Sequence, residues 1–136
     1  MDALPAFLAL NGVLIVGVSS IAGLLLYKTL LAAEDPHDWH LLHAGGSARG
    51  VLLIALGGTI HLADLSPGAM TLGAGLITLF VWVSTIAMVL RGLSGETGFS
   101  FKGALANRLG FGLYAVGVIS VFPGLAILAW GFLRAV

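Results

Sequence analysis

Four histidines and one arginine lie in one short part of the chain, residues 35–61. The histidines are His37, His40, His43 and His61. Imidazole nitrogens bind metal ions, hold haem iron and transfer protons near neutral pH. Arg49 adds a fixed positive charge that pairs well with carboxylates. Because only 9% of the residues are charged, we expect the chemistry of the protein to be concentrated in this stretch.

The spacing of the histidines limits what they can bind together. On a helix, His43 and His61 share a face, but 18 residues separate them by ~27 Å along the axis. They therefore cannot hold one metal ion within a monomer. His40 and His43 are spaced i, i+3 and could face one ion. A zinc or copper site would take its further ligands from His37, Asp35 and Asp38.

A b-type haem is an alternative that a single histidine can satisfy. It needs an axial ligand and no cysteine, and the chain has no cysteine. Ligation by two histidines needs two helices, whereas all four histidines lie in or just before one apolar segment. A haem would therefore have one histidine ligand, unless a second subunit contributes another. The simpler alternative is that the histidines hydrogen-bond headgroups or loops at the membrane surface.

The elements that carry these residues are predicted to be membrane helices. The chain has 136 residues, of which 59% are hydrophobic, and a mean hydropathy of +1.08. A soluble domain rarely exceeds about half apolar residues. The net charge is zero, which gives no indication of a nucleic-acid partner. The lack of cysteine excludes disulfides, thiol catalysis and cysteine-bound metals.

We predict an all-α integral membrane protein with a single domain over residues 1–136. Each apolar segment is long enough to cross a ~30 Å hydrocarbon core. The short connections favour an up-down-up-down four-helix bundle. The N-terminal segment lacks the basic start of a signal peptide, so we interpret it as a retained helix. The predicted spans are residues 4–31, 39–62, 69–90 and 104–133.

The basic residues predict the orientation of the bundle. Five of the six lie at or near the first and third loops. The positive-inside rule then puts these loops in the cytoplasm and both termini outside, most simply in a bacterial inner membrane. His61 would lie near the opposite surface, and we interpret it as a plain interfacial residue.

The fourth span carries a glycine at every seventh residue, namely Gly103, Gly110, Gly117, Gly124 and Gly131. A seven-residue step drifts only ~20° around a helix, so these glycines are predicted to form one groove. Grooves of small residues let membrane helices approach closely. The groove could serve packing within the bundle, a subunit interface or a flat cofactor. Pro123 is predicted to kink the span or mark a local break.

Arg49 lies ~12 Å into the second span. An arginine there costs about 2.5–3.5 kcal/mol on insertion scales, so it needs an explanation. It could snorkel to the surface, or pair with Asp38 or Glu96. The functional alternative is contact with an anion, such as a haem propionate or a polar group of a substrate.

Asn107 and Arg108 begin the fourth span. Asn107 could cap the helix, and Arg108 could anchor it at the interface. The alternative is a hydrogen bond from this pair into the bundle near His43, because the third loop and the start of the second span share one membrane face.

Two segments of the chain resemble styrene oxide isomerases. GFSFKGALANRLG, residues 98–110, is similar to the last loop and last-helix start of that family. HAGGSARG, residues 43–50, is similar to its histidine segment. The resemblance implies a helical membrane homo-oligomer, a trimer, with haem b at subunit contacts. Ferric iron would act as a Lewis acid and convert a small apolar epoxide to an aldehyde by a 1,2-shift, without net redox change.

The resemblance assigns His43 as the iron ligand, and Asn107 and Arg108 match the family. The chain also departs from it. The family has an asparagine where Arg49 stands, its active-site tyrosine falls at or near Met88, and its aspartate near Phe80.

We therefore predict that His43 binds the iron of haem b. The other residues predicted at the cofactor are His40, Arg49 and Arg108, and the catalytic candidates are Arg49 and Asn107. Three functions remain open: an isomerase-like enzyme, a non-catalytic haem-binding or sensing protein, and an accessory subunit that packs through the glycines of the fourth span.

Overall fold

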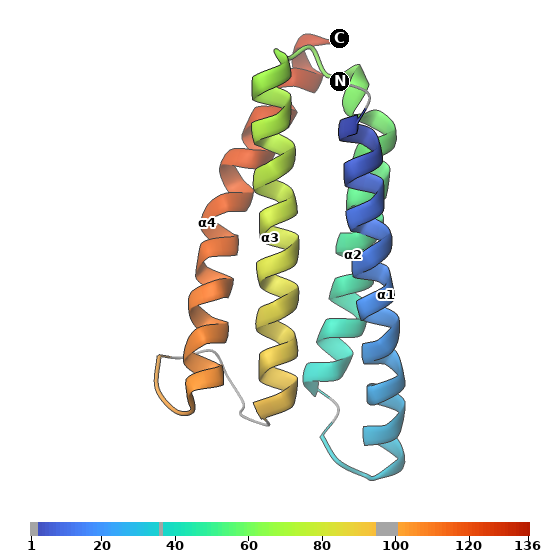
Figure 1. The fold of residues 1–136 in the computed structure, drawn as a ribbon, viewed down its shortest axis with the longest axis vertical. Helices are drawn as coiled ribbons and strands as arrows, with labels where there is room; N and C mark the ends of the chain where they lie inside the picture. Colours follow the sequence, from blue (N-terminus) through green and yellow to red (C-terminus); the bar gives the residue numbers. More distant parts are fainter. Residues whose placement is uncertain (1–2, 36, 95–100) are drawn as a thin grey trace.

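Long helices make up most of the chain in a computed structural model that describes residues 3–35, 37–94 and 101–136. They are α1 (Ala3–Leu31), α2 (His37–Thr59), α3 (Pro67–Ser94) and α4 (Leu105–Arg134), with a short 3-10 helix η1 (Ile60–Leu62) after α2. Successive helices run in opposite directions, and both ends of the chain lie at the same end of the molecule (Figure 1). The predicted all-α, up-down-up-down architecture is confirmed, with span ends that differ by at most four residues.

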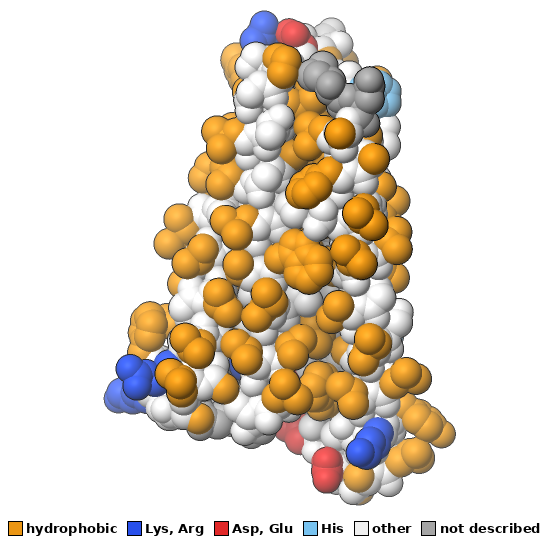
Figure 2. Space-filling view, viewed as in Figure 1, with side chains coloured by type: hydrophobic (Ala, Val, Ile, Leu, Met, Phe, Trp, Pro, Cys, Tyr) orange, Lys and Arg blue, Asp and Glu red, His pale blue; other side chains and the backbone are white. Residues whose placement is uncertain are grey.

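The surface between the two ends is apolar. Figure 2 shows hydrophobic side chains over the middle of one face, with most charged side chains near the two ends. All four helices are long and apolar enough to cross a membrane. Leu24, Ile119 and Leu133 are examples of large apolar side chains that are mostly exposed. Lipid is the solvent that such a surface fits, so the chain is an integral membrane protein.

Helices α1 and α2 form a hairpin that is closed by glycines. A Cβ atom at Gly50 would lie 2.7 Å from the carbonyl oxygen of Gly12, and one at Gly12 would lie 2.5 Å from that of Gly50. Gly57 lies equally close to the backbone of Pro5. Side chains at these positions would force the helices apart. Because lipid gives no hydrophobic force between helices, this close packing is what holds the hairpin together.

Helices α3 and α4 form the second hairpin in the same way. Gly110, Gly117 and Gly124 of α4 all face α3, with Gly117 against Val83 and Gly124 against the Gly73 backbone. The groove predicted on the fourth span is therefore filled by α3. Packing within the bundle explains it, and it is not open to a cofactor or to a second subunit.

Two details of the fourth span differ from the predictions. Gly103 does not continue the groove, because it precedes the first residue of α4 and has a positive φ of 89°. Of the two effects predicted for Pro123, the local break does not occur, because the α-helix continues to Arg134, and the kink stays a prediction. The first difference follows from the helix beginning at Leu105 rather than Ala104.

The two hairpins meet through α3, which lies between α4 and the α1–α2 pair (Figure 1). Fully buried Ile15, Leu53 and Val81 belong to the apolar core at this junction. A hydrogen bond crosses it in mid-span, where Trp82 Nε1 donates to Asn11 Oδ1 at 2.7 Å. Near the first loop, Asp38 of α2 and Arg91 of α3 form an ion pair. These contacts fix the register of α1 and α2 against α3.

Candidate functional site

His43 lies at the seam between α2 and α1. Its Nδ1 atom is 2.8 Å from the backbone carbonyl oxygen of Ser19. A carbonyl oxygen can only accept, so Nδ1 is the donor and carries the hydrogen. In the neutral imidazole, Nε2 is then the nitrogen with a free lone pair. The half-buried ring therefore has one nitrogen bound by the protein and one available to a ligand.

Ser19 holds the helix backbone on which His43 stands. Its hydroxyl lies 2.7 Å from the His43 carbonyl oxygen and 3.0 Å from that of Leu42. Ser47 donates to the same hydroxyl oxygen at 3.1 Å. Ser19 is completely buried, so these bonds are shielded from competition. Both the backbone and the side chain of Ser19 thus position His43.

Gly23 gives the His43 ring its place against α1. A Cβ atom at Gly23 would lie 2.9 Å from both Cε1 and Nδ1 of the ring, which is closer than real side chains pack. Any larger residue would therefore displace the imidazole. The sequence reasoning did not select Ser19 or Gly23. The small residues Gly12, Ser19 and Gly23 along the first span were the signal that could have indicated this contact face.

Arg49 projects from α2 toward α3, away from the seam that holds His43. Its Nη1 atom lies 3.9 Å from Met88 Sδ, and its guanidinium carbon lies 5.7 Å from the Phe80 ring centroid. The side chain folds back along α2, since a Cβ atom at Gly45 would be 3.4 Å from Nη2. The guanidinium therefore lies within one helical turn of the level of His43, next to a soft and an aromatic group.

The predicted pairing of Arg49 with Asp38 is wrong. Asp38 is 2.7 Å from Arg91, and both side chains are largely buried, at 16% and 6% exposure. The two residues meet because α2 and α3 place them at the same level near the first loop. Glu96, the other predicted partner, lies outside the described residues. Within the described part of the chain, no carboxylate forms an ion pair with Arg49.

Asn107 is buried at the start of α4, with 3% of its surface exposed. Its amide donates to the Lys102 carbonyl oxygen at 3.2 Å. It does not cap α4, because the N-cap residue is Ala104 and has no side-chain capping bond. Its Oδ1 atom has no hydrogen-bond partner among the described residues. A buried amide oxygen in this state can accept a bond from a ligand or water.

The structure does not gather all of the predicted site residues. His43 faces α1, Arg49 faces α3, and Asn107 lies where α4 packs on α3. Arg108 and His40 are exposed. A site that included all of these residues would have to extend across several helices. It would occupy the half of the bundle that carries the first and third loops.

The predicted metal-ion site of histidines and aspartates does not form. No group of three such side chains could hold a metal ion within residues 3–35, 37–94 and 101–136. Asp35 instead accepts a hydrogen bond from the His37 backbone nitrogen at 3.0 Å. Asp38 is held by Arg91. His61 is exposed at the far end of the bundle, as expected for an interfacial residue.

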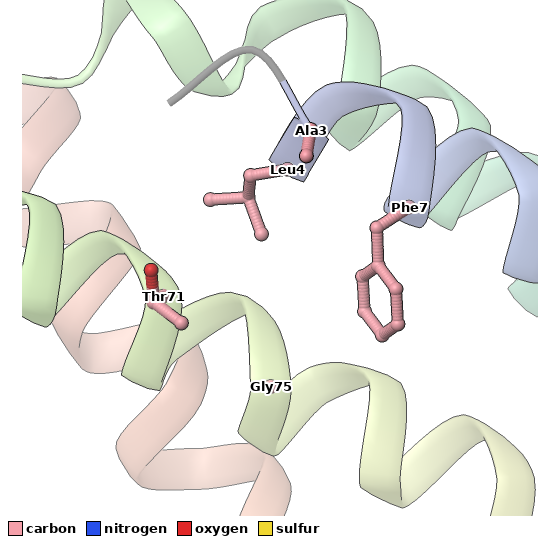
Figure 3. Close-up of a pocket in the computed structure, with 5 residues that line it drawn as sticks. All are labelled: Ala3, Leu4, Phe7, Thr71 and Gly75. Carbon is pink, nitrogen blue, oxygen red and sulfur yellow. The ribbon is translucent and has the colours of Figure 1, made fainter.

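Two of the surface cavities are lined by residues that the structure describes, and His43 lines neither of them. The larger, about 490 Å³, lies between the starts of α1 and α3 and is lined by Ala3, Leu4, Phe7, Thr71 and Gly75 (Figure 3). It is about 24 Å along α1 from Gly23, counted from Phe7. The smaller, about 260 Å³, is lined by Lys28, Glu34 and Trp39 among others. Trp39 is one helical turn before His43, so the smaller of these two cavities is the nearer to the histidine.

Comparison with known proteins places this arrangement in a family. The model of the styrene oxide isomerase family matches residues 5–133, which include His43, Arg49 and Asn107. The chain has no significant match among curated proteins. The family match covers nearly the whole of all four helices.

Proposed function

The chain belongs to the styrene oxide isomerase family, and on that premise we propose that it binds haem b through His43 and isomerises a small apolar epoxide or a similar molecule. The iron ligand would be Nε2 of His43. When bound, ferric haem supplies a Lewis acid that draws electrons from the epoxide oxygen, so that a 1,2-shift gives a carbonyl product without net redox change.

The observation that carries this proposal is the hydrogen bond from His43 Nδ1 to the Ser19 carbonyl oxygen. Histidines that bind metals usually donate their second nitrogen to a carbonyl or carboxylate, which fixes the tautomer and raises the basicity of the ligand. His43 has this arrangement through the Ser19 carbonyl oxygen. The donor set, one neutral imidazole and no cysteine, fits a b-type haem.

The residues around His43 support the chemistry by positioning and by excluding water. Ser19 and Gly23 hold the ring in one orientation, so little ordering remains to be done when a ligand binds. His43 lies on a helix that is long and apolar enough to cross a membrane. Water that would open an epoxide to a diol is therefore scarce, which favours rearrangement over hydrolysis.

We also propose that the functional unit is a homo-oligomer, a trimer by resemblance, with the haem at subunit contacts. All four histidines of the chain lie on α2 and η1. A second helix of the same chain therefore cannot supply an opposing histidine. The His43 ring is only half-buried, which leaves an edge that a neighbouring subunit could cover. Mass measurement of the detergent-solubilised protein would give the subunit number.

The proposed orientation, with the first and third loops in the cytoplasm of a bacterial inner membrane, rests on the distribution of basic residues. The chain has no cysteine, so single cysteines can be placed at Glu34 and Ser66 without background. An impermeant thiol reagent added to intact cells should label the cysteine at position 66 and not the one at position 34. Labelling at position 34 and not at position 66 would show the opposite orientation in the membrane.

A haem protein without isomerase activity is the second candidate. Its support is that Arg49 lies beside both Met88 and Phe80, and that these three are the positions at which the chain departs from the family it resembles. Replacing these positions together changes one local environment. Such a change would alter the substrate or remove the reaction while leaving the haem ligand in place.

The test is turnover of an epoxide by the purified protein with bound haem. Styrene oxide and a carboxylated aryl epoxide should be supplied separately, and aldehyde should be measured by gas chromatography. Aldehyde from either one, lost in His43→Ala and kept in His61→Ala, is the expected result. A Soret band with no aldehyde from either epoxide would reject the isomerase and favour the second candidate.

A further inference from the structure

Arg49 is a cation inside a membrane span whose neighbours do not neutralise it. Two of the described carboxylates pair with other cations, Asp38 with Arg91 and Asp64 with Arg134, and no described carboxylate forms an ion pair with Arg49. The neighbours that Arg49 does have are the Met88 sulfur at 3.9 Å and the Phe80 ring at 5.7 Å. A thioether is a weak acceptor and an aromatic face offers only a partial negative charge. The Arg49 guanidinium can therefore still bind an anionic group.

Tyr114 of α4 lies at the level of the α3 residues that Arg49 contacts. It is flanked on one helix face by Gly110, which packs against Ala87, and by Gly117, which packs against Phe80 and Val83. Residues spaced i, i+4 and i, i+3 share a helix face, so Tyr114 is at the level of α3 residues 80–87. The Phe80 ring, which Arg49 faces, also lies beside Gly117, about one helical turn from the half-buried Tyr114. Residues from three helices therefore meet here.

From this arrangement we propose that Arg49 and Tyr114 bind a carboxylate, and that the ligand is an apolar molecule that carries one. The inference deepens the proposed function by naming the substrate class as apolar acids, and it rests on that function for the reaction but not for the binding. Arg49 would bind the two carboxylate oxygens through its parallel N–H groups, and the Tyr114 hydroxyl would donate to one of them.

Charge balance favours a carboxylate over a neutral oxygen. Buried charges in proteins are paired, because an unpaired charge in a medium of low dielectric constant is costly. A bound carboxylate would bring the net charge of the site to zero, whereas an epoxide or carbonyl oxygen would leave it at plus one. The planar guanidinium matches a carboxylate with two parallel hydrogen bonds, and such bonds are about twice as strong as neutral ones. Phe80 and Met88 provide an apolar wall for the rest of the ligand.

Two sources could provide the carboxylate, a substrate acid or the propionates of haem. The first experiment measures binding of phenylacetate to the full-length protein in detergent, prepared without haem, by the rise in its unfolding temperature. Phenylacetamide, a neutral isostere, is the matched probe. We expect phenylacetate to stabilise the wild type clearly more than phenylacetamide does. Since binding raises the unfolding temperature through mass action, affinities follow from the concentration dependence.

The variants Arg49→Gln and Tyr114→Phe identify the binding groups. Arg49→Gln should remove the preference for phenylacetate, and Tyr114→Phe should weaken phenylacetate binding about tenfold, the loss of one hydrogen bond to a charged group. Arg134→Gln, which removes the same charge at the exposed far end, should keep the preference. Far-UV circular dichroism shows that each variant is folded, and Arg49→Lys, which keeps the charge, is a second variant that should bind with intermediate affinity.

The second experiment tests the cofactor as the source. Haem and haem dimethyl ester, which has no free carboxylate, are titrated into wild type and Arg49→Gln. One outcome would assign the carboxylate to the cofactor. In it, wild type binds the ester more weakly than haem, Arg49→Gln binds both equally, and phenylacetate shows no preference over phenylacetamide. If neither phenylacetate nor haem shows a dependence on Arg49, the carboxylate site is overturned. If haem does not bind at all, the proposed function fails, while the phenylacetate measurement still decides the binding site.

Discussion

The His43 imidazole and the Ser19 backbone, 24 residues apart in sequence, are joined by a hydrogen bond of 2.8 Å between Nδ1 and the carbonyl oxygen. The bond connects α1 to α2 at the one histidine that combines partial burial with a fixed tautomer. Because it takes up Nδ1, it directs any iron to Nε2. The proposed cofactor site thus depends on packing between the first two helices.

Replacing Gly23 by alanine should weaken haem binding without unfolding the protein. The new Cβ atom would lie 2.9 Å from the His43 ring and push it off its carbonyl partner. Loss of such a supporting contact typically costs about 10- to 100-fold in metal affinity. The measurement is a haem titration followed by absorption. Gly17→Ala is the control on the same helix, because a Cβ atom there meets nothing within 4 Å. Equal haem affinity in both variants would contradict the positioning role of Gly23.

Ser19→Ala should lower the free energy of unfolding by about 1 kcal/mol, since hydrogen bonds between membrane helices average ~0.6 kcal/mol each. The variant loses the bonds of the hydroxyl to the α2 backbone and to Ser47. Ser20→Ala is the matched control, because Ser20 is exposed and bonds only the Val16 carbonyl oxygen of its own helix. Unfolding in mixed micelles would measure both. A loss as large in Ser20→Ala as in Ser19→Ala would show that the inter-helix bonds have no special weight.

Gly50→Ala should separate the first hairpin and destabilise the protein by about 1–3 kcal/mol, the usual range for overpacking. Its Cβ atom would lie 2.7 Å from the Gly12 carbonyl oxygen, and backbone cannot move aside cheaply. Gly58→Ala, on the same helix, meets nothing within 4 Å and should leave stability unchanged or slightly raised. The unfolding temperatures of the two variants test this. A lower unfolding temperature for Gly58→Ala than for Gly50→Ala would show that the close glycine contacts do not hold the hairpin together.

Asp38→Asn should destabilise the contact between the hairpins by about 3 kcal/mol, because it removes the carboxylate that pairs with the buried Arg91 side chain. Asp64→Asn removes the other ion pair, that with Arg134, whose side chains are 58% and 53% exposed. That pair should contribute less than about 1 kcal/mol. Chemical unfolding of both variants gives the comparison. If the two cost the same, the burial of the Asp38–Arg91 pair has no energetic consequence.

Local patterns were sufficient to predict the helices but not their partners. Hydropathy predicted all four spans, and the seven-residue glycine repeat predicted a packing groove on α4. The repeat could not show that α3 fills the groove, because the partner of a groove depends on tertiary structure. Gly103 was included wrongly, since the repeat continues into residues that precede the helix.

The candidate site was predictable only in part. His43 was selected from its place on the second span and from the family resemblance, but Ser19 and Gly23 act on it from another helix. Asp38 was assigned to Arg49 because both are on or near one span, whereas the register between α2 and α3 gives it to Arg91. Contacts between helices such as these depend on rotation and register, and a single sequence does not specify either.

The most direct test of the central claim is the absorption spectrum of the full-length protein purified from cells with an ample haem supply. Wild type and His61→Ala should both show a Soret band, and His43→Ala should lose it, because His43 has one ring nitrogen bound to a backbone carbonyl oxygen and the other available to the iron. A His43→Ala protein that is folded and keeps the wild-type Soret band would contradict the assignment of His43 as the haem ligand.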